Sequence, residues 1–213
     1  MNSPLNISLL NKPSKQSGLS MVEVLVTLVI LMVGLLGLAG LQMQGLRSEM
    51  ESYQRVQALV LLKDMAGRIN TNRGNRNQAG CLGIGNQAAQ NTCEWNAITA
   101  SISSYLADDI GVGSVAVCNG LTGQDRDTCE WGNALRGAGV TDGGASIGTM
   151  IGGRGCIRQV SADANQITVE ISVAWQGLGK SFQAENTCGQ GEYGDDDTLR
   201  RVVSLTTQIG NLR

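Results

Sequence analysis

Cysteine is the residue type whose number and position indicate chemistry most directly in this chain. There are six, and no two are spaced as C-x-x-C, so zinc ribbons and thioredoxin-type redox motifs are poorly supported. All of them lie after an apolar N-terminal segment, and an even number on one side of such a segment favours three disulfides in an oxidising compartment. The alternative is six reduced thiols in a cytosolic protein. The cysteines are Cys81, Cys93, Cys118, Cys129, Cys156 and Cys188.

Two cysteine-containing segments share an order of residues: CLGIGNQAAQNTCEWNAI begins at Cys81 and CNGLTGQDRDTCEWGNAL begins at Cys118. Each has a Cys, a stretch with Gly and Gln, and then Thr-Cys-Glu-Trp. Six cysteines allow many connectivities, and the simplest expectation is two similar, locally closed loops. The expected pairs are Cys81 with Cys93, Cys118 with Cys129, and Cys156 with Cys188.

Other residues that could do chemistry are scarce. Histidine is absent, which excludes His-based triads, His general bases and His-ligated metals. The acids Asp195, Asp196 and Asp197, with Glu192 nearby, are interpreted as a solvated loop; calcium binding is the alternative, although EF-hand spacing is missing. The glycine-rich segment 137–155 has no Walker lysine and is expected to be a loop that does not bind phosphate. We therefore expect no enzyme and no cofactor.

Two groups of side chains could contact a ligand. Trp95 and Trp131 are expected to cover the disulfides or the core, with a carbohydrate-binding pair as the alternative. Arg68, Arg73 and Arg76 lie at the expected end of a long helix, where solvated arginines complement the helix dipole; a nucleic-acid contact is the alternative. The formal net charge of -2 is too small to indicate nucleic acid or acidic partners.

The first element that must position these residues is a membrane-length apolar segment. From Leu19 to Leu41, Glu23 is the only charged residue. As a helix this segment would span roughly 35 Å, enough for a hydrocarbon layer of about 30 Å. Lys12 and Lys15 precede it, which favours a cytoplasmic N-terminus and residues beyond about 45 on the other side.

Glu23 has two interpretations, because a carboxylate is unfavourable inside a membrane. In the first, it lies shallow enough to be hydrated among the headgroups. In the second, the chain is cleaved within Ser17-Gly18-Leu19, which removes a basic leader and keeps the apolar helix, unlike a secretory signal. Glu23 then pairs with the new α-amine of Leu19 on a neighbouring subunit. Hydropathy alone leaves both open.

The rest of the chain predicts an α+β fold. The helix is expected to continue as an amphipathic helix to about Asn72, with Gly74 as its stop signal. Residues 96–111 predict a short helix, residues 156–177 a strand hairpin and residues 199–210 a last strand. Apolar residues with helical spacing before Asn72 are Leu46, Met50, Tyr53 and Val60, and also Leu59, Leu62, Ala66 and Ile69.

The segment Gly18-Leu19-Ser20-Met21-Val22-Glu23 resembles the type IV prepilin cleavage motif, in which Gly precedes the first mature residue and Glu is the fifth. The stretches VLVTLVILMVGLLGLAGLQMQGLR and QALVLLKDMAGRINTNR extend the resemblance, over about the first 75 residues, to the PilV-type minor pilins. In that family a peptidase cuts after the Gly and methylates the new N-terminus. The resemblance thus implies cleavage between Gly18 and Leu19, N-methylation of Leu19, and a role for Glu23 in subunit assembly. The usual first mature residue is Phe, from which Leu19 departs.

The resemblance also implies the type IV pilin fold, with a long helix packed on a C-terminal antiparallel sheet and disulfide-bonded loops. Four parts are expected: a leader (1–18), a transmembrane or filament-core helix (19–41), its amphipathic continuation (42–74) and a periplasmic head domain (75–213). Before assembly the chain would be a single-pass inner-membrane protein, and afterwards it would lie at the cell surface in the pilus.

The function implied is that of a minor pilin that enters type IV pili near the tip, helps to initiate assembly and so supports twitching motility and adhesion. The implied partners are other minor pilins, the major pilin, the prepilin peptidase, the inner-membrane assembly machinery and a tip adhesin; nucleic acid is not expected. One alternative is a minor pseudopilin of a type II secretion system, which has the same N-terminus. Another is a glycan- or DNA-binding module displayed on a pilus.

Overall fold

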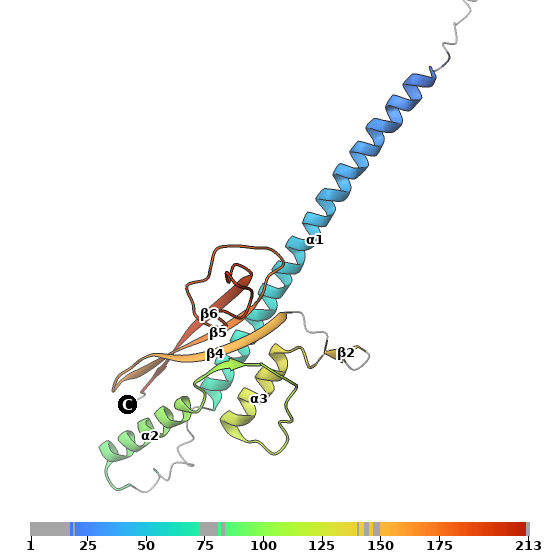
Figure 1. Ribbon diagram of the computed structural model, residues 1–213. Coiled ribbons are helices and arrows are strands. Elements are labelled where there is room, and N and C mark those ends of the chain that lie inside the picture. Colours follow the sequence, from blue (N-terminus) through green and yellow to red (C-terminus); the bar gives the residue numbers. More distant parts are fainter. Residues whose placement is uncertain are drawn as a thin grey trace, which may run out of the picture. The chain divides into compact units, whose positions relative to one another are not determined.

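The structure is a computed structural model, and it describes residues 18, 20–72, 81, 84–139, 141–142, 145–146 and 150–211 (Figure 1). The chain divides into two compact units, Met1–Leu46 and Arg47–Arg213. The helices are α1 (Met21–Thr71), α2 (Gln87–Ser103) and α3 (Gly123–Leu135). The strands are β1 (Ala107–Ile110), β2 (Thr141–Asp142), β3 (Ala145–Ser146), β4 (Ile151–Ala162), β5 (Gln166–Gln176) and β6 (Arg200–Gly210).

The second unit is built around a four-stranded antiparallel sheet in the order β1-β4-β5-β6. Strands β4 and β5 form the expected hairpin, and β6 is the expected last strand, antiparallel to β5 with Ile171 opposite Leu205. The turn of the hairpin is fixed by the Asp163 carboxylate, which accepts hydrogen bonds from the backbone N–H groups of Asn165 and Gln166. Alternation along β5 buries the apolar side chains on one face, namely Ile167, Val169, Ile171 and Val173.

Helix α1 contributes its C-terminal half to the core of this unit. The buried side chains follow helical spacing, from Ala58 through Leu62 and Met65 to Ile69. They belong to one hydrophobic cluster with side chains of α2, α3 and the sheet. The result is the expected α+β architecture of the pilin type, in which a long N-terminal helix, a C-terminal antiparallel sheet and three disulfides occur together.

The amphipathic character of α1 differs from the expectation in one respect. Of the two apolar sets expected there, Leu62, Ala66 and Ile69 are buried, whereas Leu46, Met50, Tyr53, Leu59 and Val60 are exposed. Both faces of the helix are apolar enough to be buried, and packing against the sheet selects one of them. Gly74 lies outside the described residues.

The expected helix over residues 96–111 is wrong at both ends. Helix α2 begins earlier, at Gln87, because the Asn86 side chain accepts from the Ala88 N–H and caps it. It ends at Ser103, and Ala107–Ile110 pairs with β4 as strand β1. The left-handed backbone of Asp109 (φ 59°) and Gly111 (φ 95°) is incompatible with a helix continuing through this segment.

Helix α3 was not expected, and neither was the strand structure in the glycine-rich segment 137–155. Strands β2 and β3 pair within it, and β4 begins at Ile151. The glycines of β4 are required because α3 packs directly on them. A Cβ on Gly155 would overlap the Trp131 ring, and one on Gly153 would lie 2.6 Å from the Leu135 carbonyl oxygen.

Candidate functional site

The expected processing point lies immediately before α1. Gly18 and Ser20 are both exposed, and no heavy atom would lie within 4 Å of a Cβ placed on Gly18. Leu19, the expected site of cleavage and N-methylation, lies outside the described residues. Gly18 is therefore exposed, as the cleavage point of a protease substrate must be.

Glu23 lies in the first turn of α1. Its backbone N–H donates to the Ser20 carbonyl oxygen at 2.9 Å, and the Val24 N–H donates to the same oxygen at 3.2 Å, so Ser20 closes the start of the helix. A carboxylate in the first turn is stabilised by the positive end of the helix dipole. The Glu23 side chain is exposed and makes no ion pair with any residue that the structure describes. Its negative charge therefore has no partner within this part of the chain.

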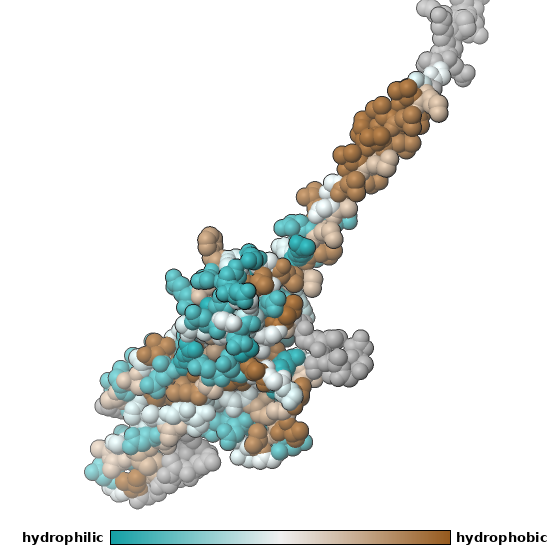
Figure 2. Space-filling view, viewed as in Figure 1, coloured by the Kyte–Doolittle hydropathy of each residue, from teal (hydrophilic) through white to brown (hydrophobic). Residues whose placement is uncertain are grey.

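The helix that carries Glu23 has an apolar surface on every side. One window of α1 has a mean hydropathy of 2.8, and none of it is buried. The side chains are exposed around the whole circumference, for example Leu35 (65%), Leu36 (73%) and Leu38 (57%). On the face that Figure 2 shows, the N-terminal part of the helix is mostly brown, with paler patches. Such a surface is unstable in water, and its length and composition fit a membrane-spanning helix.

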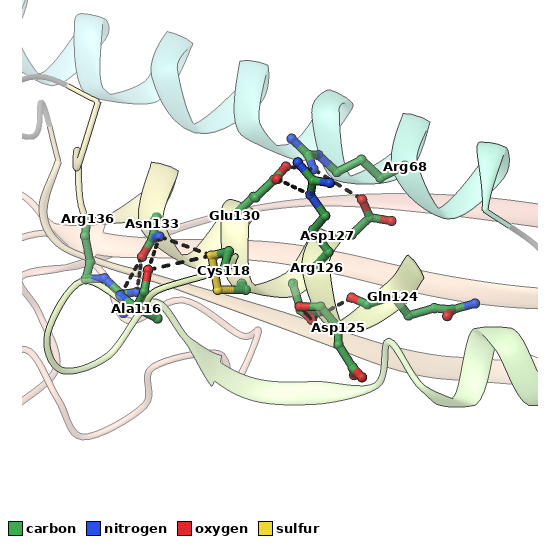
Figure 3. Close-up of a disulfide and its surroundings, with 12 residues drawn as sticks. Arg68, Ala116, Cys118, Gln124, Asp125, Arg126, Asp127, Glu130, Asn133 and Arg136 are labelled. Atoms are coloured by element: carbon green, nitrogen blue, oxygen red, sulfur yellow. Dashed lines mark hydrogen bonds and ion pairs between the residues drawn. A yellow bond between two sulfur atoms is a disulfide. The ribbon is translucent and has the colours of Figure 1, made fainter. Parts of the chain in front are cut away.

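The three disulfides join the pairs that the sequence favoured: Cys81–Cys93, Cys118–Cys129 and Cys156–Cys188. The two locally closed loops are partly helical, because Cys93 lies in α2 and Cys129 lies in α3. Close to Cys118, the Asn133 side chain donates to the Ala116 carbonyl oxygen and accepts from the Ala116 backbone N–H (Figure 3). Thus α3 holds the segment before Cys118 both covalently and by hydrogen bonds.

Arg68 lies in the last turn of α1, as expected, but it is only partly solvated, because its side chain is 27% exposed and its guanidinium is bound to three carboxylates. Its guanidinium donates to Asp64 of α1 at 2.9 Å. It also donates to two residues of α3 that Figure 3 labels, Asp127 at 3.2 Å and Glu130 at 2.9 Å. Burial by itself lowers the pKa of Arg68, but hydrogen bonds to Glu130 and Asp64 outweigh it and raise the pKa above its usual value. Arg68 therefore joins α1 to α3. Arg73 and Arg76 lie outside the described residues.

The tryptophan pair does not form a ligand surface. Trp131 is fully buried in the core, and its indole N–H donates to the Leu61 carbonyl oxygen at 2.9 Å. Trp95 is partly buried and packs against the same core. Since only Trp95 reaches the surface, stacking of a sugar between the two rings is excluded.

The acidic segment is not a uniformly solvated loop. Asp196 pairs with Lys180 at 2.8 Å, and Glu192 pairs with Arg154. Asp197 is only 8% exposed and pairs with Arg200, whereas Asp195 is exposed. Three of these four carboxylates already have cationic partners, and the described residues contain no group of three or more His, Cys, Asp or Glu side chains arranged to hold a metal ion.

Two buried polar clusters were missed by the sequence analysis. The Tyr105 hydroxyl donates to Asp127, and burial raises the pKa of Tyr105 well above its usual value. Arg200 is 2% exposed, and its guanidinium donates to the Asp197 carboxylate. It also donates to three backbone carbonyl oxygens, those of Ala184, Asn186 and Cys188. Neither pattern is recognisable in sequence, since the partners are either distant in the chain or look like an ordinary charged turn.

Comparison with known proteins gives one match. Residues 13–39 match the family model described as the prokaryotic N-terminal methylation motif. No curated protein and no solved structure matches the chain. The matched residues include the expected cleavage point and Glu23 and extend far into the apolar part of α1. Together with the apolar helix, this match supports a type IV pilin-like or pseudopilin-like protein.

Proposed function

We propose that this chain is a minor pilin of the PilV type. In this proposal it is cut after Gly18, methylated on Leu19, stored in the inner membrane by its apolar helix and then incorporated into type IV pili. It enters near the tip, where it helps to initiate assembly and so supports twitching motility and adhesion. It is a structural subunit and carries out no catalysis.

The observation that carries this proposal is the methylation motif, which spans the start of an apolar helix that continues into the head domain. Residues 13–39 hold the motif, and α1 extends to Thr71, where it is part of the core of the second unit. A cleaved secretory signal would be separated from the mature protein. Here the same helix supplies the apolar surface and, with its C-terminal half, part of the core of the second unit.

A pilus offers this helix an alternative to the bilayer. The exposed leucines and valines of α1 require an apolar environment. Both a lipid layer and a filament core made of similar helices supply one, so transfer between them leaves most of the apolar surface covered. The partners we propose are other minor pilins, the major pilin, the prepilin peptidase, the inner-membrane assembly machinery and a tip adhesin.

In this proposal Glu23 determines how the helix docks on a neighbouring subunit when it moves from the bilayer into the filament. A carboxylate surrounded by apolar side chains is strongly stabilised by a positive charge at hydrogen-bond distance. The α-amine of Leu19, freed by cleavage, is such a charge on a neighbouring subunit. Among the described residues of this chain, no cationic side chain pairs with Glu23 and would compete with that α-amine.

The first experiment tests processing. Gly18→Val in the full chain should remain at precursor mass, because a branched side chain blocks the residue that a prepilin peptidase needs before its cleavage point. Gly37→Val, a glycine change within the apolar helix where a Cβ meets no atom within 4 Å, is the matched control and should be processed. Intact-mass spectrometry should find the control without residues 1–18 and with one added methyl group. Processing of Gly18→Val at the parent rate contradicts the proposal.

The second experiment separates a pilus from a type II secretion system, since both use this type of N-terminus. Deleting the gene and imaging the cells should show few or no surface pili. Protein export should be unchanged. Normal pili together with a loss of export would instead assign the chain to a secretion pseudopilus.

A further inference from the structure

Phe182 is the least buried aromatic side chain in the described part of the protein. It is the single phenylalanine of the chain, and 98% of it is exposed. By contrast, Trp131, Tyr105 and Tyr193 are all less than 5% exposed. An aromatic ring of this size covers about 150 to 250 Å² when buried, so full exposure leaves a large apolar area in water.

Phe182 lies in the loop between β5 and β6, residues 177–199, and hydrogen bonds hold the residues on both sides of it. The Ser181 N–H donates to the Thr198 carbonyl oxygen at 2.8 Å, and the Gln183 side chain donates to the Asp196 carbonyl oxygen at 2.7 Å. Lys180 pairs with Asp196 at 2.8 Å. The ring is therefore exposed because its backbone is held away from the core, and not because the loop lacks structure.

The base of the loop is held just as firmly. Arg201 donates to the Gly179 carbonyl oxygen at 2.6 Å, and Arg200 binds the carbonyl oxygens of Ala184 and Cys188. The Cys156–Cys188 disulfide ties the loop to β4. A partner that binds Phe182 would have little loop motion to arrest, and a preorganised anchor of this kind binds more tightly than a mobile one.

The charges of the loop restrict the kind of partner. Three of its five acids, Glu192, Asp196 and Asp197, have cationic partners. Glu185 and Asp195 are exposed and make no ion pair with a described residue. Lys180 and Arg201, the basic residues next to the loop backbone, already have acidic partners. The loop thus combines one exposed aromatic ring with two exposed carboxylates that have no cationic partner among the described residues.

We propose that Phe182, with Glu185 and Asp195, is an anchor for a different pilin-type subunit that offers an apolar pocket with basic side chains at its edge. This inference rests on the proposed function, which supplies neighbouring subunits. Aromatic side chains are enriched at the centres of protein interfaces, and complementary charge at the rim orients the partner. An anionic lipid surface is disfavoured, because the two unpaired carboxylates would be repelled by it.

The experiment places a photo-reactive phenylalanine analogue at position 182 of the full chain in its own cells, with the same analogue at Val117 as control. Val117 is 80% exposed and apolar but lies outside the loop. Position 182 should form one dominant product with another protein that carries a prepilin-type N-terminus, and position 117 should not. Products with lipid, with a second copy of this chain or with no protein overturn the inference.

Substitutions test the roles of the ring and its rim. Phe182→Ala should lower recovery of that partner with the affinity-tagged chain by about tenfold or more, and Phe182→Leu should restore part of it. Glu185→Lys combined with Asp195→Lys should also weaken recovery, most clearly at low salt. All three variants should keep the parent melting temperature, because the changed side chains are exposed. Parent-level recovery with Phe182→Ala overturns the inference; if that variant is still cut after Gly18 and enters pili, the proposed function stands.

Discussion

Arg68 and Arg126 both donate to Glu130, yet from different surroundings. The Arg68 side chain is 27% exposed and also binds Asp127, whereas the Arg126 side chain is 61% exposed. Removing Arg68 leaves the mostly buried Asp127 carboxylate, 11% exposed, without its cationic partner, whereas exposed pairs such as Arg126 with Glu130 contribute little. Arg68 lies on α1 and Arg126 on α3, so the difference between the stability losses on removing each side chain measures how much the Arg68 contacts between α1 and α3 stabilise the fold.

We expect Arg68→Ala to lower the free energy of unfolding by about 2 to 3 kcal/mol and Arg126→Ala by less than about 1 kcal/mol. Chemical denaturation of the full chain in mild detergent, followed by tryptophan fluorescence, measures both. Trp131 lies in the core, so its signal reports on the second unit. Equal losses in the two variants would contradict the joining role of Arg68.

Two exposed carboxylates make the protein sensitive to acid. A hydrogen bond from Lys180 lowers the pKa of Asp196 from 3.8 to about 2, and a hydrogen bond from Arg126 lowers the pKa of Glu130. Because these pKa values are lower in the folded state, folding favours the ionised form, and the stabilisation is present above about pH 4. It is lost as the pH falls toward the lowered values.

The melting temperature at low salt should therefore fall more steeply between about pH 4 and pH 2 for the parent than for Asp196→Asn, which cannot ionise. Salt should reduce the difference, since both carboxylates are exposed to solvent. Melting curves that shift in parallel for parent and variant would show that Asp196 is not linked to folding.

At the scale of elements, apolar periodicity predicted α1, the β4–β5 hairpin and β6, because these elements are long and bury one regular face. It could not predict which apolar face of α1 is buried, since Tyr53 and Val60 are as apolar as the residues that face the core. Helix α3 was missed because its sequence is mostly polar, with Trp131 and Leu135 as its fully buried large side chains. Its position depends on the Cys118–Cys129 disulfide and on contact with β4.

Gly155 tests how closely α3 approaches β4. A Cβ there would overlap the Trp131 ring and lie 2.8 Å from Leu135 Cδ1, so Gly155→Ala should destabilise the protein by about 1 to 3 kcal/mol through overpacking. Gly210→Ala, at the end of β6, is the matched control because no atom lies within 4 Å of its Cβ position. Thermal unfolding of the two variants gives the comparison, and similar melting temperatures would argue against the close contact.

For the whole molecule, the proposed cleavage and assembly residues can be read from the sequence more directly than the head domain. Gly18 and Glu23 are recognised by their spacing in one short segment, and the apolar helix after them needs no tertiary information. The burial of Arg200 and of Trp131 and the exposure of Phe182 arise only when the head folds. A short linear motif thus supports a type IV pilin-like or pseudopilin-like protein, while the features that distinguish this chain lie in the folded head.

In the proposed assembly Glu23 pairs with a neighbouring subunit, and its substitution should separate storage in the membrane from incorporation into pili. Glu23→Ala should be cut after Gly18 and extracted with the membrane like the parent, because the apolar surface of α1 is unchanged. Its amount in sheared pili should drop by at least about tenfold, since a charge pair in an apolar filament core loses its negative member. Glu49→Ala, also an exposed acid of α1 but beyond the apolar run, is the control and should enter pili normally. If Glu23→Ala reaches pili at the parent level, the α-amine pairing is wrong and the membrane anchor alone remains.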